Sequence, residues 1–382
     1  MTAEKIKVTH VITALPRGGA QSVLFQLLQR TDKSRFDMDV VSLADKGVVG
    51  EKIAELGISV KSLNMGRRFP NPAKVLRLAR WLRTRQPDLV QTWLYHGDLV
   101  GGLAARLAGR PVLWNLRQSD LDPRTTRRAT MLTAKTCARL SLIIPRTIVC
   151  CSQASRDVHT ALGYDGKRMT VIGNGVDLDR YRPDTTAGAA LRKEIGVNDG
   201  ARLVGLVARF HPQKDHQTFL TAAAQVCSHV DDVHFVLCGE DVDDSNSALG
   251  AMIGQTGFAD RFHLLGIRDD IPRVTGAFDV AMSSSSYGEG FPNVLLEALA
   301  CGVPCVTTDV GDSARIAGST GWVTPPGDAE ALAAALAQAL AISPSDLGAK
   351  ATAARAMAEE AHSISRMIQA YESLYEATVT GP

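Results

Sequence analysis

Short runs rich in β-branched residues alternate with longer segments of helical spacing along nearly the whole 382-residue chain. This alternation is typical of parallel sheets covered by helices, because parallel neighbours need a crossover connection long enough for a helix. Strands are expected near residues 6–13, 37–43, 59–63, 89–92, 112–115, 147–152 and 170–172, and then near 203–208, 234–238, 262–265, 279–283, 305–307 and 322–324. A chain of this length exceeds what one hydrophobic core usually serves, so we predict two doubly wound α/β domains.

The charge of the chain changes sign near its middle. Residues 1–182 contain 30 Lys and Arg against 15 Asp and Glu, whereas residues 183–382 contain 12 against 25. The turn-rich stretch 173–188 coincides with this change and is typical of a linker. We therefore place a first Rossmann-like domain at residues 1–178 and a second at 179–361, and expect a ligand in the cleft between them.

The last segment of the chain is predicted to be a helix that packs on a core. Ile364, Ile368, Tyr371 and Tyr375 follow one another at helical spacing, which makes an apolar stripe. We expect this helix over residues 362–378 and expect it to pack back on the first domain.

The composition is that of a globular protein in a reducing compartment, with 45% hydrophobic and 21% charged residues. The seven cysteines are odd in number and mostly lie within apolar runs, which indicates buried thiols. The first eight residues lack the apolar stretch of a signal peptide, and Glu330 and Gln338 interrupt the Ala-rich segment 329–341. We expect neither secretion nor a membrane span and place the protein in the cytoplasm.

Two cations follow the predicted strand 203–208. Arg209 comes at its end, and Lys214 comes just before a helix expected to begin near Asp215. Ligands of open α/β sheets bind outside the carboxyl ends of the strands. A guanidinium and an ammonium at such a place suit a diphosphate whose charge grows as it leaves, although two solvated surface cations would give the same pattern.

The segment 283–302 combines a strand end, a glycine loop and a helix start. Gly288 and Gly290 allow a tight loop, Pro292 suits the first helical position and Gly302 suits the stop. Backbone donors at the helix start would favour a phosphate. The carboxylates of two acids suit sugar or ribose hydroxyls, unless both are only solvated surface groups. These acids are Glu289 in the loop and Glu297 in the helix.

The run Glu289-Gly-Phe-Pro-Asn-Val-Leu-Leu-Glu297-Ala resembles the donor-site signature of the retaining GT-B glycosyltransferases of family 4, the group 1 glycosyltransferases. Segment 204–215 is similar to the part of that family with an Arg and Lys pair on the diphosphate, and 171–183 is similar to its interdomain segment. The run Ala14-Leu-Pro-Arg-Gly18-Gly19-Ala-Gln21 is similar to its glycine-rich first loop. The resemblance covers almost the full chain and implies the GT-B fold, two Rossmann-like domains that face each other across a cleft.

The resemblance also implies roles for single residues. Arg209 and Lys214 would hold the donor diphosphate and stabilise it as it leaves, Glu297 would bind the nucleotide ribose, and Glu289 would contact the transferred sugar. The remaining donor-side positions that it implies are Gly18, Gly19, Gly290, Phe291, Pro292 and Asn293. Transfer in the family proceeds with retention and without a metal or other cofactor, with a phosphate oxygen of the leaving group taking the acceptor proton.

The chain departs from the family's pattern after the strand 112–115. Many relatives have a His there, whereas this chain reads Trp114-Asn-Leu-Arg117. No His role is carried to Arg117, and we place Asn115 and Arg117 only on the acceptor side. His96 is the nearest imidazole in a plausible cleft position, so it is our candidate for contact with sugar or acceptor, although lone histidines are more often structural.

Metal and nicotinamide sites find little support in the sequence. Asp-x-Asp pairs, which hold metal-bound donors in the other glycosyltransferase fold, begin at Asp37, Asp120, Asp177 and Asp241. With 28 Asp in the chain, about two such pairs are expected by chance, so the motif alone carries little weight. Cys301 and Cys305 have no His cluster nearby, which makes zinc improbable. No Gly-x-Gly-x-x-Gly follows the first strand, which argues against a nicotinamide cofactor.

Two basic segments make an anionic partner plausible for the first half. One holds Arg124, Arg127, Arg128, Lys135, Arg139 and Arg146 among apolar residues, and the other holds Arg67, Arg68, Lys74, Arg77, Arg80, Arg83 and Arg85. Both are solvated helix faces in the simplest interpretation. The functional interpretation is docking to the anionic inner face of a membrane, where a lipid-linked acceptor can be reached. Nucleic acid is disfavoured because the segments lack interleaved aromatic residues.

The resemblance, together with the basic first half, implies a peripheral membrane hexosyltransferase. It would move a sugar from a UDP or GDP sugar to a lipid-linked or glycan acceptor during the biosynthesis of a surface polysaccharide such as lipopolysaccharide or capsule. A sugar-nucleotide epimerase and a noncatalytic nucleotide-sugar-binding protein on the same fold are the alternatives. An epimerase would convert the donor with no acceptor present, and a binding protein would neither transfer nor hydrolyse it.

Overall fold

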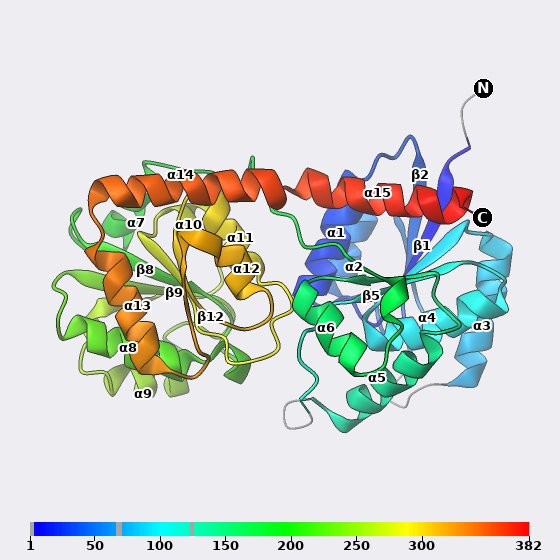
Figure 1. The fold of residues 1–382 in the computed structure, drawn as a ribbon, viewed down its shortest axis with the longest axis horizontal. Coiled ribbons are helices and arrows are strands. Elements are labelled where there is room, and N and C mark those ends of the chain that lie inside the picture. The colour runs from blue at the N-terminus through cyan, green and yellow to red at the C-terminus, as the bar shows by residue number, and fades with distance from the viewer. Residues whose placement is uncertain (1–3, 66–70, 123–125, 382) are drawn as a thin grey trace. The chain divides into compact units, whose positions relative to one another are not determined.

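The computed structural model describes residues 4–65, 71–122 and 126–381 of the chain. These residues form two compact units (Figure 1). Unit 1 comprises residues up to Asn174 together with the segment from Ser365 onward, and unit 2 comprises Gly175–Ile364. The division falls at 174/175, within the turn-rich stretch, whereas the sequence places the first domain end at residue 178.

Unit 1 is built on a seven-stranded sheet in the order β3-β2-β1-β4-β5-β6-β7. Every neighbouring pair is parallel. The strands are β1 Ile6–Ile12, β2 Phe36–Ser42, β3 Ser59–Ser62, β4 Leu89–Trp93, β5 Val112–Leu116, β6 Thr147–Cys150 and β7 Met169–Val171. The helices of this unit are α1 Gly19–Arg30, α2 Gly47–Glu55, α3 Pro72–Arg85, α4 Leu94–Leu107, α5 Arg128–Leu140, α6 Gln153–Ala161 and α15 Ile364–Thr380.

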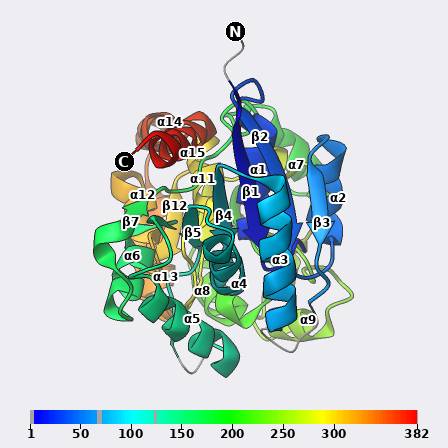
Figure 2. The same cartoon turned by 90° about the vertical axis from the view of Figure 1, so that its right-hand side faces the viewer.

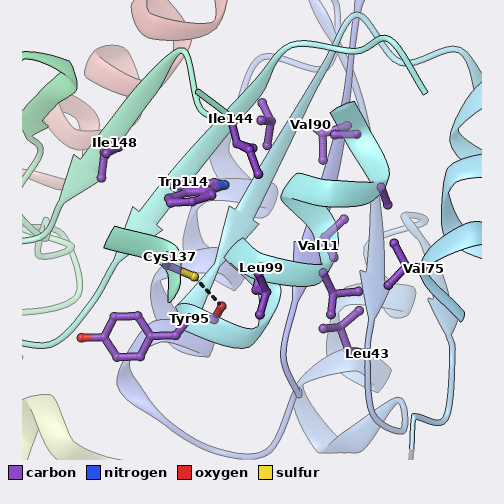
Figure 3. Close-up of a cluster of buried hydrophobic side chains, with 14 of the residues drawn as sticks. Val11, Leu43, Val75, Val90, Tyr95, Leu99, Trp114, Cys137, Ile144 and Ile148 are labelled. Carbon is purple, nitrogen blue, oxygen red and sulfur yellow. Dashed lines mark hydrogen bonds between the residues drawn. The ribbon is translucent and has the colours of Figure 1, made fainter. Parts of the chain in front are cut away.

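Helices α3, α4 and α5 cover one face of this sheet (Figure 2). Trp114 of β5 is fully buried there, and Gly102 of α4 leaves room for its indole, since an added Cβ would lie 2.7 Å from the ring nitrogen. The thiol of Cys137 on α5 donates to the carbonyl of Tyr95 on α4, as Figure 3 shows. The core of unit 1 therefore fixes α4, the helix that follows β4.

The C-terminal helix α15 packs on the polar side chains of unit 1's inner strands. The amide of Asn115 on β5 donates to the Tyr371 hydroxyl at 2.9 Å, and the Tyr375 hydroxyl donates to Gln91 of β4. Trp93 donates to the Nδ1 of His10 on β1 at 3.2 Å. Tyr371 and Tyr375 are fully buried, as the apolar stripe of the sequence predicts.

Unit 2 contains a second all-parallel sheet, of six strands in the order β10-β9-β8-β11-β12-β13. The strands are β8 Arg202–Val207, β9 Val233–Cys238, β10 Phe262–Leu264, β11 Val280–Ser283, β12 Cys305–Thr308 and β13 Trp322–Thr324. The helices are α7 Ala187–Ile195, α8 His216–Cys227, α9 Ser247–Gly254, α10 Ile271–Gly276, α11 Asn293–Ala300, α12 Ser313–Ala317, α13 Ala329–Ala341 and α14 Pro344–Ala361.

Alternate residues of β8 serve two separate cores of unit 2. Val204 and Leu206 pack with α8, α9 and α13, whereas Leu203 packs with α7, α10, α11 and α14. This alternation follows from the period of two in a strand, which turns successive side chains to opposite faces. Because helices cover both faces of the sheet, a ligand can bind only at the ends of the strands.

Every strand predicted from the sequence is present within two residues of its expected ends. All seven cysteines are free thiols, and six are buried, while Cys227 is half-buried. Among the described residues, no single helix has the length and hydropathy of a membrane span. Helix α13 passes that test only in combination with Ser345–Ala361, across a bend of 110°.

Candidate functional site

The first group of candidate residues in unit 2 follows β8. The strand ends at Val207, and Arg209 lies exposed two residues later. A 3₁₀ turn, Pro212–Lys214, then leads to Asp215, which has a left-handed backbone (φ 48°) and caps α8 by accepting from the amide of Thr218. The short turn and the cap fix Lys214 between the end of the strand and the start of the helix.

The loop after β11 is tied to this turn by hydrogen bonds. The amide of Ser286 donates to the carbonyl of Gln213 at 2.9 Å, and the hydroxyl of Ser284 donates to the carbonyl of Lys214 at 2.8 Å. The hydroxyl of Thr308, at the end of β12, donates to the carbonyl of Ser285 at 2.6 Å. The carboxyl ends of three neighbouring strands are thus joined through one polar network.

Lys214 and Glu289 meet in this network. The ammonium of Lys214 forms an ion pair with the Glu289 carboxylate, whose Oε1 also accepts from the Ser285 hydroxyl at 3.0 Å. Their side chains are only 18% and 11% exposed. An ion pair sheltered to this degree is less weakened by solvent than a surface pair, so both side chains are held in place.

Two glycines allow neighbouring loops to approach this network. Gly311 follows β12 with φ 64°, and a Cβ there would lie 2.0 Å from the carbonyl oxygen of Glu289. Gly239 follows β9, and a Cβ there would lie 2.2 Å from the carbonyl oxygen of Ala208. Glycine is favoured at both positions, because any side chain would overlap neighbouring backbone and force it to shift.

Helix α11 begins beside the glycine loop. The helix starts at Asn293, so Pro292 is its N-cap. The sequence had predicted Pro292 to be the first helical residue. Proline is tolerated at the cap because its missing N–H has no partner there in any case. The side chain of Pro292 makes no capping hydrogen bond, and the positive end of the helix dipole at this start favours an anion.

Glu297 lies one turn into α11 and is half-buried. Burial raises the pKa of its carboxyl to about 7, while the nearby Tyr181 hydroxyl and the charge of Arg180 act in the opposite direction. Near neutral pH this group is therefore divided between its neutral and ionised forms.

In unit 1 the candidate glycines lie between β1 and α1. Gly18 is the N-cap of α1, and Gly19 is its first residue. Gln21 ties the loop down by donating to the carbonyl of Ala14 at 3.0 Å. The loop therefore presents backbone and a helix start at the carboxyl end of β1, as a phosphate-facing loop requires.

His96 lies in the first turn of α4, directly after β4. The junction residue Leu94 has a left-handed backbone (φ 68°), which is costly for a leucine and therefore a sign of a constrained turn. The amide of Gly97 donates to the hydroxyl of Thr13 beyond β1 at 3.1 Å. His96 is half-buried, and burial lowers its pKa, so the imidazole is largely neutral at physiological pH.

The structure corrects one of the two acceptor-side assignments. Asn115 is fully buried and holds Tyr371, so its side chain stabilises the packing of α15 and does not face an acceptor. Arg117 is half-buried, bonds to the side chain of Asn174 and lies 5.9 Å from the ring centre of Trp93. Arg117 remains a candidate residue for the acceptor side.

The Asp-x-Asp pairs have other partners or lie apart from the network. Asp37 and Asp39 both form ion pairs with Arg85 of α3. Asp177 caps the turn that follows it, and Asp243 accepts from the amide and hydroxyl of Ser245. Within the described ranges, no group of three or more His, Cys, Asp or Glu side chains is arranged to hold a metal ion.

Comparison with known proteins identifies the family. The family described as Glycosyltransferase Family 4 matches residues 17–180, and the one described as Glycosyl transferases group 1 matches residues 201–341. The chain belongs to the group 1 glycosyltransferases. It has their GT-B architecture of two Rossmann-like domains.

Individual similar proteins cover between 37% and 97% of the chain. A UDP-Gal:alpha-D-GlcNAc-diphosphoundecaprenol alpha-1,3-galactosyltransferase of Escherichia coli is 26% identical over 318 residues, 81% of each protein. The lipopolysaccharide core biosynthesis mannosyltransferase LpsB of Rhizobium meliloti is 30% identical over 145 residues, 37% of this chain and 41% of LpsB. The crystal structure of Anabaena HepE with UDP superimposes with a TM-score of 0.85 at 22% identity, covering 97% of this chain and 100% of HepE.

This group 1 glycosyltransferase brings some predicted site residues into contact and leaves others apart. Lys214 and Glu289 touch, and Glu297 follows them on the same loop-helix segment. His96 and Arg117 belong to unit 1, so their meeting with the donor-side residues of unit 2 stays a prediction.

The sequence did not lead us to predict three residues near the candidate donor site: Tyr181, Ser285 and Gly311. Gly311 lies four residues after the predicted strand 305–307, and this position was a usable signal because β12 ends at the same edge of the sheet as β8 and β11. No local pattern marks the effect of Tyr181 on the pKa of Glu297, since 115 residues of chain separate them.

Proposed function

We propose that this glycosyltransferase transfers a sugar from a nucleoside diphosphate donor held by unit 2, with retention of configuration and without a metal ion. The observation that supports this most directly is the network at the ends of β8, β11 and β12. It holds an ammonium and a carboxylate in contact, with the exposed guanidinium of Arg209 five residues before Lys214.

The network's residues divide the donor between them. Arg209 and Lys214 would hold the diphosphate, and their charge would stabilise it as negative charge develops on the leaving oxygen. Glu289 would accept from hydroxyls of the transferred sugar, and the amides of Gly290, Phe291 and Asn293 would line the phosphates. Glu297 would accept from the ribose. A phosphate oxygen of the leaving group would take the acceptor proton, with the acceptor attacking the face that the diphosphate leaves.

The similar proteins guide the choice of donor and acceptor. HepE binds UDP in its crystal structure, and the Escherichia coli relative is named for UDP-Gal and a diphosphoundecaprenol-linked acceptor. We propose a UDP sugar first and a GDP sugar second as donor, a lipid-linked or glycan acceptor, and a role in polysaccharide or lipopolysaccharide biosynthesis.

We further propose that unit 1 docks on the inner face of a membrane from the cytoplasm. Leu132 of α5 is 68% exposed, and Leu142 and Ile143 just beyond the helix are 56% and 63% exposed. Arg128, Lys135 and Arg139 share the outer face of α5 with Leu132, and none of these cations has a carboxylate partner within the described part of the chain. Exposed apolar residues ringed by cations suit an anionic lipid surface. Arg67, Arg68 and Arg124 lie outside the described residues.

The donor site is tested by thermal stabilisation with a panel of UDP, GDP and ADP sugars. One nucleotide class is expected to stabilise the wild-type protein, and Lys214→Ala and Glu297→Ala are each expected to weaken its binding about 10- to 100-fold. Lys193→Ala, an exposed lysine of α7 in the same unit, is the matched control and should bind normally. Equal stabilisation of all four proteins, or none of the wild type, would argue against the site.

The reaction is tested with the donor class that binds. Retention predicts that the anomeric configuration of the product, read by NMR, equals that of the donor, and metal independence predicts equal rates with and without a chelator. Conversion of the donor sugar without an acceptor would indicate an epimerase. Binding with neither transfer nor hydrolysis in the presence of lipid-linked acceptors would indicate a noncatalytic binding protein.

A further inference from the structure

Ser285, in the serine run 283–286 at the end of β11, makes a direct contact with the ion pair of the donor site. Its side chain is 2% exposed, and its hydroxyl donates to Oε1 of Glu289 at 3.0 Å. The ammonium of Lys214 pairs with the same oxygen, Oε1. One carboxylate oxygen thus accepts from a charged group in the turn after β8 and from a neutral group in the loop after β11.

The backbone that carries this hydroxyl is held by hydrogen bonds to two other strand ends. The carbonyl of Ser285 accepts from the hydroxyl of Thr308, at the end of β12, at 2.6 Å. The residues directly before and after Ser285 are bonded to the turn that follows β8. Movement of Ser285 would break these bonds, so the hydroxyl is a fixed point against which the Glu289 carboxylate is oriented.

The two groups on Oε1 would respond differently to a bound diphosphate. In the function proposed above, Lys214 binds the diphosphate, which carries more negative charge than one carboxylate. The ammonium would then be drawn from Glu289 toward the phosphates. The hydroxyl of Ser285 has no net charge to be drawn in this way, and its backbone is bonded on both sides. Ser285 is therefore the contact that would keep Glu289 oriented while the nucleotide is bound.

We propose that Ser285 is a positioning residue for recognition of the transferred sugar, because it holds the Glu289 carboxylate toward the sugar hydroxyls once Lys214 has turned to the diphosphate. This inference rests on the proposed function of unit 2, in which Glu289 accepts from the sugar. Hydrogen bonds weaken steeply when their angles are poor, so a rotated carboxylate would lose its bonds to the hydroxyls. Affinity for the nucleotide alone does not require this orientation.

The test compares the dissociation constants of UDP and GDP with those of their sugars, measured by calorimetry. The sugar probes are UDP-glucose, UDP-galactose, UDP-N-acetylglucosamine and GDP-mannose. For the probe that binds most tightly, the dissociation constant of its nucleotide divided by that of the nucleotide sugar reports the sugar contacts. Ser285→Ala is expected to lower this ratio about tenfold and to leave the affinity for the nucleotide unchanged.

A second variant and a control separate this role from a general effect on the loop. Glu289→Ala should lower the ratio at least as far, and adding Ser285→Ala to it should change little. Thr320→Val is the matched control and should keep the wild-type ratio. Thr320 belongs to the same unit and is 1% exposed, and its hydroxyl donates to the carbonyl of Ala317 at 3.0 Å.

The outcomes distinguish this inference from the donor site itself. An unchanged ratio in Ser285→Ala or in Glu289→Ala would overturn the inference and leave the nucleotide site in place. A tenfold further loss in the Glu289→Ala background, or equal weakening of nucleotide and nucleotide sugar, would also overturn it, because either would show a purely structural effect. No binding of any probe by the wild-type protein would overturn the donor site, and this inference with it.

Discussion

Asp98 is an acid that the fold of unit 1 buries completely, without a basic partner among the described residues. Its Oδ1 accepts from the hydroxyl of Thr92 at 2.5 Å and from the backbone amide of Asn115 at 3.4 Å, while Oδ2 has no hydrogen-bond partner. Burial outweighs both hydrogen bonds and raises its pKa to about 8. The folded protein therefore keeps a proton on Asp98 that the unfolded chain releases above its ordinary pKa.

We expect Asp98→Asn to stabilise the protein at alkaline pH. Because the folded state binds the extra proton, the stability of the wild type falls as the pH rises from about 4 to 8, whereas the amide has no such dependence. The difference between variant and wild type should grow by up to about 1.4 kcal/mol per pH unit over this window. Urea unfolding of both proteins at pH 5 and pH 8 measures it, and an equal difference at the two values would contradict the assignment.

Gly311→Ala should reduce donor binding through the backbone of Glu289. A Cβ at this position would lie 2.0 Å from that carbonyl oxygen, so the loop after β11 must shift. Gly257 also has a left-handed backbone (φ 78°), but nothing lies within 4 Å of its added Cβ. Gly257→Ala therefore shows the conformational cost alone, about 1–2 kcal/mol of stability. Only Gly311→Ala is expected to weaken donor affinity by tenfold or more. Similar donor affinities for the two variants would show that overlap with the Glu289 backbone does not disturb the site.

At the scale of elements, helix α5 is expected to carry the membrane contact. Leu132→Ser with Ile143→Ser should lower binding to vesicles of phosphatidylglycerol and phosphatidylcholine by about a hundredfold, since each exposed leucine or isoleucine contributes about 1.5–3 kcal/mol when fully buried and about 1.4 kcal/mol is a factor of ten. Leu76→Ser with Leu107→Ser removes similarly apolar but less exposed residues elsewhere on unit 1 and is the control. Equal vesicle binding by the two double variants would place the contact elsewhere.

The elements were largely predictable, and their long-range contacts were not. Alternation of strand and helix patterns located all thirteen strands, because each pattern is written within a few consecutive residues. The glycine loop and the two cations that we propose for the donor side could be picked out from the sequence for the same reason. Asn115 was misplaced because its burial depends on Tyr371, more than 250 residues later in the chain, and no local pattern reports such a contact.

At the scale of the molecule, the division of charge follows the division into units. Unit 1 carries 29 Lys and Arg against 15 Asp and Glu, and unit 2 carries 13 against 25. A positive unit with exposed apolar residues and a negative unit are expected to respond differently to the ionic strength of the solvent. Vesicle binding is accordingly expected to weaken as ionic strength rises, while the Lys214–Glu289 contact, being sheltered, should be less affected.

The chain also makes unit 1 dependent on its own last segment. Helix α15 follows all of unit 2 in the sequence, yet its buried Met367, Ile368, Tyr371 and Tyr375 complete unit 1. At about 1.5–3 kcal/mol for each buried apolar side chain, these contacts are comparable with the whole stability of a domain. Unit 1 therefore cannot be complete until the entire chain has been made.

Deletion of residues 365–382 should accordingly unfold unit 1 and leave unit 2 folded. Hydrogen exchange read by mass spectrometry is expected to show lost protection in β1, β4 and β5, because Gln91, Asn115 and His10 would lose their cover, and unchanged protection in β8, β9 and β11. Deletion of 381–382 alone, beyond α15, is the control. Full protection of β4 and β5 in the longer deletion would show that the sheet of unit 1 is stable without the helix.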